Sequence, residues 1–230
     1  MADQASNRDG DDLGRRFTRL AGIIAVLRER CPWTAALTHQ SLLEYLVEEA
    51  YEVVEAVEAG HTGPGDADEL ASELGDVLFQ VLLHARLQEE AGHFGIGDVV
   101  DSLTAKMIRR NPHVFAPDGS VRAETTDDPA EIERAWDEVK KTEKPGRTSP
   151  FDGIPAGLPA LALAAKTQDR ARRAGLDVPP ANPDAATVPA PQGFDELGDH
   201  LFDVVRQAQA QGLDAEAALR AAVRRFTSRP

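Results

Sequence analysis

The chain has 230 residues, a formal net charge of −14 and one cysteine, Cys31. One cysteine excludes an intrachain disulfide framework, and we interpret it as structural. The acidic balance argues against a nucleic-acid polymer as partner, because binding a phosphate backbone requires clustered Lys and Arg. Aromatic residues make up 5% of the chain and β-branched runs are scarce, so we expect an all-α fold.

The first twelve residues, MADQASNRDGDD, are almost entirely polar. They predict a disordered tail over residues 1–12 and lack the basic and apolar regions of a signal peptide. No apolar run in the chain is long enough to span a membrane. We therefore expect a cytoplasmic protein with no membrane partner.

Apolar spacing predicts four helices after this tail, which together suggest a helical bundle. The first runs from about Leu13 to Arg30 and ends at Cys31-Pro32-Trp33. The second, capped by Thr38 or Ser41, runs to about Ala59, before the helix-breaking stretch Gly60–Gly65. The third opens at Asp66 or Asp68 and ends near Ala91. The fourth follows the turn Gly92–Gly97 and stops before Pro112.

The second half of the chain is less regular. Residues 116–128 predict a polar loop, and a shorter helix from about Pro129 to Lys144 contains Trp136. Residues 145–160, rich in Pro, Gly, Ser and Thr, predict a linker, after which Leu161–Ala174 is helical again. Val178–Gly193 contains five prolines and is not expected to form a continuous helix.

The distribution of charge singles out the segment between Cys31 and Ala85. This segment contains eleven Asp or Glu residues and no Lys or Arg. It includes the motifs Glu48-Glu49-x-x-Glu52 and Glu73-x-x-Asp76. Like charges three or four residues apart on a helix repel one another, whereas carboxylates are the preferred ligands of hard divalent cations such as Mg²⁺. The segment therefore predicts a metal site.

Helical periodicity places each pair of acids beside the apolar face of its helix. If the two helices pack antiparallel across the glycine-rich turn, Glu49 and Glu52 can meet Glu73 and Asp76. The alternative interpretation is a pair of solvated helix faces, since charged residues are mostly exposed.

A second charged group is basic. It comprises Lys106, Arg109, Arg110 and His113, followed by Lys140, Lys141, Lys144 and Arg147. Ordinary surface cations near helix C-termini would account for it. Beside a carboxylate metal site, such residues would instead bind a polyphosphate. Trp33 and Trp136 can be core residues or platforms on which a base stacks.

The chain also contains an internal repeat. Glu73-Leu74-Gly75-Asp76 recurs as Glu196-Leu197-Gly198-Asp199, and Leu-Phe follows in both copies at the same spacing. The proline-rich stretch stands where the second copy should have its own E-E-x-x-E helix. We therefore expect residues 161–230 to form a degenerate repeat.

These motifs resemble the MazG nucleoside triphosphate pyrophosphohydrolases, and the similarity covers most of the chain. Asp152-Gly153-Ile154-Pro155 also resembles the link into the second repeat of that family. The matching elements are Cys31-Pro32-Trp33, Ser41-Leu42 through Tyr45-Leu46-x-Glu48-Glu49-x-Tyr51-Glu52, Glu73-Leu74-Gly75-Asp76-x-Leu78-Phe79-Gln80, Arg109-Arg110-x-Pro112-His113-Val114-Phe115 and Trp136-x-x-Val139-Lys140.

The resemblance implies an all-α, MazG-like helical bundle, usually a homodimer, that cleaves nucleoside triphosphates to the monophosphate and pyrophosphate with Mg²⁺; Mn²⁺ is a possible substitute. It also implies residue roles. The metal ligands would be Glu49, Glu52, Glu73 and Asp76, with Glu48 as a further catalytic acid; the substrate-binding residues would be Lys106, Arg109, Arg110, Trp136 and Lys140.

Two departures from the family pattern stand out. Thr34 follows Cys-Pro-Trp where members of the family commonly have Asp, and the second repeat lacks the E-E-x-x-E motif. We expect residues 13–144 to form one active module, and residues 161–230 to be catalytically silent.

Two other functions compete with nucleotide-pool house-cleaning by this hydrolase. The first is a non-catalytic helical oligomer that binds nucleotide or metal. The second is a di-iron carboxylate bundle, which needs two Glu-x-x-His motifs within helices. The two matches, Glu58-x-x-His61 and Glu90-x-x-His93, each cross a glycine that ends a predicted helix.

Overall fold

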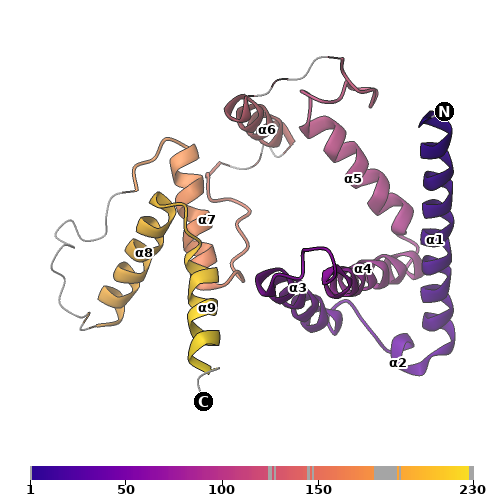
Figure 1. The fold of residues 1–230 in the computed structure, drawn as a ribbon, viewed down its shortest axis with the longest axis horizontal. Coiled ribbons are helices and arrows are strands. Elements are labelled where there is room, and N and C mark those ends of the chain that lie inside the picture. Colours follow the sequence, from indigo (N-terminus) through magenta and orange to yellow (C-terminus); the bar gives the residue numbers. More distant parts are fainter. Residues whose placement is uncertain are drawn as a thin grey trace. The chain divides into compact units, whose positions relative to one another are not determined.

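The computed structural model describes residues 2–123, 126, 128–143, 146, 148–178, 191 and 193–227. This part of the chain forms nine α-helices and contains no strand beyond one isolated β-bridge, as the all-α prediction requires. The helices are α1 (Ala2–Arg30), α2 (Pro32–Ala35), α3 (Leu42–Ala59), α4 (Ala67–Glu90), α5 (Ile96–Arg110), α6 (Pro129–Glu143), α7 (Ala160–Arg173), α8 (Phe194–Ala210) and α9 (Ala215–Thr227) (Figure 1).

The chain divides into two compact units, Met1–Trp136 and Asp137–Pro230. The division falls within α6, ahead of the linker expected over residues 145–160, and the extent of the catalytic module remains a prediction. Most of the proline-rich stretch Val178–Gly193 lies outside the described residues. Among the helices that are described, none has a long enough apolar run to cross a membrane.

α1 begins at Ala2, eleven residues before the expected start at Leu13, and so extends over the segment assigned to a tail. At the end of that segment, the Asp12 carboxylate pairs with Arg16 at 2.7 Å and with Arg15 at 3.7 Å. Pairs at these spacings stabilise a helix. The helix ends at Arg30, as predicted, and the short helix α2 follows directly.

α3 and α4 form the central helical hairpin of the first unit (Figure 1). Gly60 ends α3 with a φ of 91°, a left-handed conformation that glycine adopts without steric strain. The turn returns the chain along α3, so α3 and α4 run side by side. This is the antiparallel arrangement that the sequence predicted for the two acidic helices.

The core of the first unit joins α1, α3 and α4 and lies on one side of the hairpin. Its buried members are Ile24, Leu37, Leu42, Leu82 and Leu83. Burying a side chain of this kind stabilises a fold by about 1.5–3 kcal/mol. Because this core fixes the rotation of α3 and α4 about their axes, it also determines which side chains of the two helices face one another.

An arginine ties the ends of this unit together. The Arg28 guanidinium donates two hydrogen bonds to Glu90, at 2.6 and 3.2 Å. It also donates to the backbone carbonyl oxygens of Thr34 and Leu37. Its side chain is only 9% exposed. Arg28 therefore holds the Cys31–Leu37 segment against the C-terminal end of α4.

In the second unit, α7, α8 and α9 pack on one another. Val205 and Gln168 are buried at the centre, where the Gln168 amide donates to the carbonyl oxygen of Phe202 at 2.9 Å. The Gln209 amide donates to the carbonyl oxygen of Ala165 at 2.8 Å. Side-chain amides thus cross-link α7 and α8 in addition to apolar packing.

Candidate functional site

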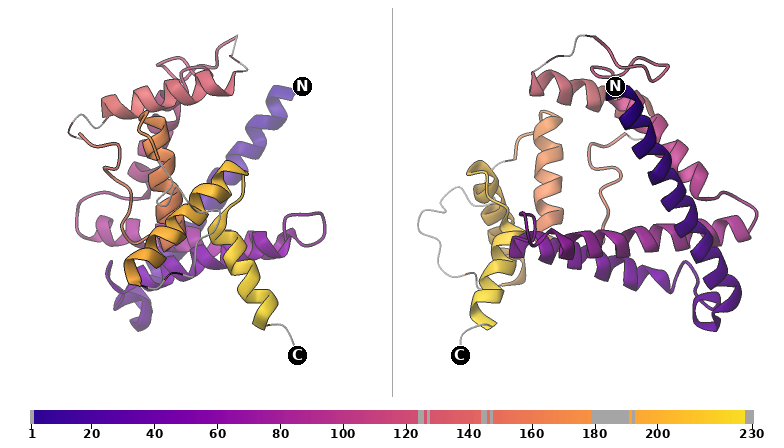
Figure 2. Two further views of the ribbon diagram at one scale, coloured as in Figure 1. Left: turned by 90° about the vertical axis from the view of Figure 1, so that its left-hand side faces the viewer. Right: turned by 45° about the vertical axis from the view of Figure 1, so that its right-hand side comes forward.

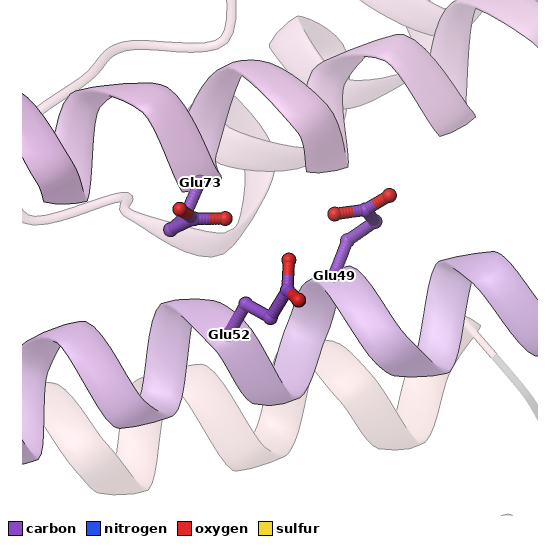
Figure 3. Close-up of side chains that lie close together, drawn as sticks. All are labelled: Glu49, Glu52 and Glu73. Atoms are coloured by element: carbon purple, nitrogen blue, oxygen red, sulfur yellow. The ribbon is translucent and has the colours of Figure 1, made fainter.

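Three glutamates meet between α3 and α4. Glu49 and Glu52 project from α3, and Glu73 projects towards them from α4 (Figure 3). One carboxylate oxygen from each lies within 4.8 Å of the other two. The predicted meeting of the two acidic motifs is therefore present for these three residues.

The local sequence explains how the acids come together. Glu49 and Glu52 are three residues apart, so they lie on the same side of α3. The core residues Leu42 in α3 and Leu82 in α4 turn the apolar faces of both helices inward, which leaves the flanking acids to face one another along the edge of the hairpin.

This crowding changes the protonation of the carboxyls. Partial burial raises the pKa of Glu49, and the neighbouring Glu52 and Asp76 raise that pKa further. Partial burial also raises the pKa of Glu73, and Glu52 again adds to the effect. Each carboxyl thus disfavours the ionised form of its neighbour. A bound cation would relieve this repulsion.

Asp76 and Glu48 lie beside the group of three. Asp76, one turn after Glu73 in α4, is half-buried and contributes to the raised pKa of both Glu49 and Glu73. Glu48 is exposed and also contributes to the raised pKa of Glu49. Both are therefore electrostatic neighbours of the cluster, and their roles as ligand and catalytic acid remain predictions.

The chemistry of the donors fits a hard divalent cation. α3 carries no Lys or Arg, and the single arginine of α4, Arg86, pairs with Glu89 and Glu90 near the other end of that helix. Several carboxylate oxygens close together, with water and phosphate oxygens completing the shell, suit Mg²⁺ or Mn²⁺. Glu49, Glu52 and Glu73 can hold such an ion.

Four of the predicted substrate-binding residues, Lys106, Arg109, Arg110 and Trp136, lie elsewhere in the first unit. α5 runs from the C-terminal end of α4 towards α6, so its basic end points away from the α3–α4 hairpin (Figure 2). There the Arg110 guanidinium lies over the Trp136 ring, 5.4 Å from its centre. Lys106 is half-buried and Arg109 is exposed, whereas the Lys140 side chain lies outside the described set. Their contact with substrate remains a prediction.

The structure also brings together residues that the sequence analysis did not single out. His39, before α3, and His84, in α4, face one another with 2.7 Å between their Nδ1 atoms. The sequence contained one usable signal: His84 follows Glu73 by eleven residues, close to three helical turns, so both lie on the same side of α4.

Comparison with known proteins identifies the chain. Residues 37–115 match the family model for the MazG nucleotide pyrophosphohydrolase domain. The chain is 35% identical to the nucleoside triphosphate pyrophosphohydrolase/pyrophosphatase MazG of Thermotoga maritima, over 95% of the chain and 85% of that protein. The chain belongs to the MazG family. The family suggested by the sequence motifs is therefore confirmed.

Two further relatives extend this similarity. The nucleoside triphosphate pyrophosphohydrolase of Escherichia coli K12 is 33% identical over 93% of the chain and 85% of its own length. An uncharacterized 26.1 kDa protein of Streptomyces cacaoi is 43% identical, over 91% of the chain and 78% of its own length. These matches extend well beyond residues 37–115 and therefore reach the second unit.

Proposed function

We propose that this MazG-family protein hydrolyses nucleoside triphosphates to nucleoside monophosphates and pyrophosphate with a divalent cation. The meeting of Glu49, Glu52 and Glu73 between two helices that otherwise lack nearby cations is the main support. The Thermotoga maritima and Escherichia coli relatives are named nucleoside triphosphate pyrophosphohydrolases, which supports the same reaction. The family resemblance further suggests nucleotide-pool house-cleaning in the cytoplasm.

Glu49, Glu52, Glu73 and Asp76 are the proposed metal ligands, with Mg²⁺ as the preferred ion and Mn²⁺ as an alternative. When bound, the ion supplies Lewis-acid polarisation of the triphosphate and lowers the pKa of water. The raised pKa values of Glu49 and Glu73 favour metal binding at neutral rather than acidic pH, since the ligands must be deprotonated.

In the proposed reaction, a water oxygen attacks the α-phosphorus, and the bond from that phosphorus to the oxygen bridging to the β-phosphate breaks. Pyrophosphate leaves with that oxygen. Glu48, exposed beside the cluster, positions the water and accepts its proton. Lys106, Arg109, Arg110 and Lys140 are the proposed phosphate-binding cations, and Trp136, already in contact with Arg110, is a proposed substrate contact.

A second copy of the chain is the proposed partner. Leu43, Val47 and Val57 lie along one side of α3 and are 47%, 56% and 49% exposed. Val47 follows Leu43 by four residues, and Val54 and Val57 follow Val47 by seven and ten residues. Apolar residues at these spacings form the contact line between two packed helices. Exposed apolar stripes of this kind mark protein interfaces. Val47→Glu should convert a dimer into a monomer in analytical ultracentrifugation.

The reaction is tested by incubating the protein with each nucleoside triphosphate and Mg²⁺ and separating the products. Monophosphate and pyrophosphate are expected. Diphosphate and inorganic phosphate would point to attack at the γ-phosphorus and contradict the proposal. Unchanged nucleotide with either Mg²⁺ or Mn²⁺ would favour a non-catalytic binding protein.

A further inference from the structure

Trp33 is an exposed aromatic side chain next to the start of the α3–α4 hairpin. It lies in the short helix α2, which leads into α3 (Figure 1), and it is 59% exposed. Tryptophan is on average a highly buried residue. The sequence left two interpretations of Trp33, a core residue or a platform on which a base stacks, and this exposure rules out the core.

The neighbours of Trp33 fix its position. Thr34 and Leu37 are only 2% and 8% exposed. Arg28 donates hydrogen bonds to the backbone carbonyl oxygens of both. Pro32 stands at the start of α2, where its ring restricts the backbone dihedral φ. The indole ring of Trp33 is therefore exposed on a segment of backbone that is itself held in place.

Tyr45 of α3 orients the indole ring. The two ring centres are 6.5 Å apart and the ring planes meet at 75°, which is an edge-to-face contact. Tyr45 is half-buried and packs against the core of the first unit. Whichever ring supplies the edge, this contact leaves at least one face of the indole free of Tyr45. Trp33 therefore offers a flat apolar surface to a ligand ring.

Tyr45 lies in line with the glutamate cluster. It precedes Glu49 by four residues and Glu52 by seven, about one and two turns, so all three lie on the same side of α3. Because the Trp33 ring is 6.5 Å from the Tyr45 ring, it is on the order of 10–15 Å from the Glu49 carboxylate. A nucleotide with its phosphates at the cluster spans this gap, because the ribose separates its base from the α-phosphate.

An exposed tryptophan can also belong to a protein interface. The proposed contact with a second copy uses Leu43 and Val47, each two residues from Tyr45. Two residues turn a helix by about 200°, so these side chains lie on the opposite side of α3 from Tyr45. Trp33 adjoins the side of α3 that carries the glutamates, which favours a ligand of the proposed metal site over a second copy.

We propose that the exposed face of Trp33 stacks on the base of the nucleotide whose phosphates bind at the glutamate cluster. The proposal rests on the proposed hydrolase function and names a subsite for its substrate. Every base has a flat aromatic face, so this platform adds binding free energy without selecting one base over another. Tyr45 acts as a positioning residue, because its ring holds the indole in one orientation.

The test compares two substrates with the same triphosphate, a nucleoside triphosphate and ribose 5-triphosphate, which lacks the base. Trp33→Ala removes the platform. It should raise KM for the nucleoside triphosphate roughly tenfold or more, the usual cost of losing one base–aromatic contact, and change KM for ribose 5-triphosphate less than about twofold. The matched control is Phe194→Ala, which removes a 92% exposed aromatic ring from α8 and should alter neither KM.

A second variant, Trp33→Phe, keeps a smaller aromatic face. It should raise KM for the nucleoside triphosphate only about threefold, with circular dichroism confirming that both variants are folded. Equal effects of Trp33→Ala on the two substrates, or no effect on either, would overturn the proposal. A loss with both substrates, together with dissociation in analytical ultracentrifugation, would instead make Trp33 a contact with a second copy.

If the wild type cleaves neither substrate, the hydrolase function itself fails. The subsite is then judged by calorimetric titration with the same two compounds in Mg²⁺. Binding of the nucleoside triphosphate that is weakened by Trp33→Ala but not by Phe194→Ala, with binding of ribose 5-triphosphate unaltered, supports the subsite. Undetectable binding of the nucleoside triphosphate, or equal weakening for both compounds, refutes it.

Discussion

α4 and α8 both contain the four residues E-L-G-D, yet they have different surroundings. Their burial follows the same register: Gln80 and Leu82 in α4 are 3% exposed, and the corresponding Asp203 and Val205 in α8 are 4% and 0% exposed. The shared motif therefore coincides with a shared pattern of packing. Among the described residues α8 keeps this pattern without an acidic partner helix, so we expect that the motif alone does not make a metal site.

The charges beside the two helices differ most. α4 packs on α3, which carries six glutamates and no Lys or Arg. α8 packs on α7, whose single acid, Asp169, pairs with Arg173 at 3.0 Å and Arg172 at 3.7 Å. α3 has no basic residue to pair with its carboxylates, whereas α7 pairs its one carboxylate with its own arginines. We therefore infer that the charges of the neighbouring helix decide whether the E-L-G-D motif can take part in binding a cation.

The largest predicted effect compares equivalent glutamates of the two helices. Glu73→Gln removes one proposed ligand and should lower kcat/KM for nucleoside triphosphates roughly 100-fold or more. Glu196→Gln, at the matching position of α8, should leave kcat/KM unchanged. The measurement is pyrophosphate release at saturating Mg²⁺. Comparable losses in both variants would show that the second unit takes part in catalysis.

The next prediction concerns the arginines that tie neighbouring helices together. Arg28→Ala leaves Glu90 and two backbone carbonyls without their shared donor and should lower the free energy of unfolding by about 2 kcal/mol. Arg172→Ala removes one hydrogen bond to Gln209 and an ion pair with Asp169 at 3.7 Å, both from a side chain that is 51% exposed. It should cost less than about 1 kcal/mol. Urea unfolding measures both, and equal costs would contradict the comparison.

Local patterns in the sequence predicted most of the helices and the meeting of the acids. Helix periodicity placed Glu49, Glu52 and Glu73 beside the core, and the breaker at Gly60 implied an antiparallel return. These features depend on residues close in the chain. The early start of α1 was missed because residues 1–12 are polar and include Gly10.

Other features depend on contacts that sequence spacing does not reveal. Arg28 and Glu90 are 62 residues apart, and His39 and His84 are 45 apart. Neither pair has a local pattern that predicts its contact. Thr34 is a further case: it is only 2% exposed, and its carbonyl binds Arg28. This position is therefore part of the structural tie between α1 and α4, where a neutral side chain is buried without an ionic partner of its own.

A smaller effect should appear in the pH dependence of the Arg28 tie. Hydrogen bonding to Arg28 lowers the pKa of Glu90 below its ordinary value of 4.5. The unfolded chain therefore binds this proton more readily, and the stabilisation by Arg28 is present above pH 4.5 and declines as the pH falls below it. The difference in unfolding free energy between wild type and Arg28→Ala should shrink below pH 4.5. A difference that stays constant down to pH 3 would contradict this assignment.

The smallest effect concerns metal-free protein and changes sign when metal is added. Glu52 raises the pKa of both Glu49 and Glu73. In EDTA at pH 7, Glu52→Gln should stabilise the fold by a few tenths of a kcal/mol, because it removes repulsion among like charges. This gain should fade as the pH falls through the raised pKa values, since neutral carboxyls no longer repel.

With saturating Mg²⁺, the same Glu52→Gln variant should be less stable than wild type, because a ligand that binds the folded state stabilises it in proportion to its affinity. Asp199→Asn, in the E-L-G-D motif of α8, should show no such reversal. Thermal unfolding in EDTA and in Mg²⁺ measures both variants. If the stability of Asp199→Asn relative to wild type also reverses when Mg²⁺ is added, α8 binds the cation too. If the stability of Glu52→Gln does not reverse, Glu52 is not one of the ligands.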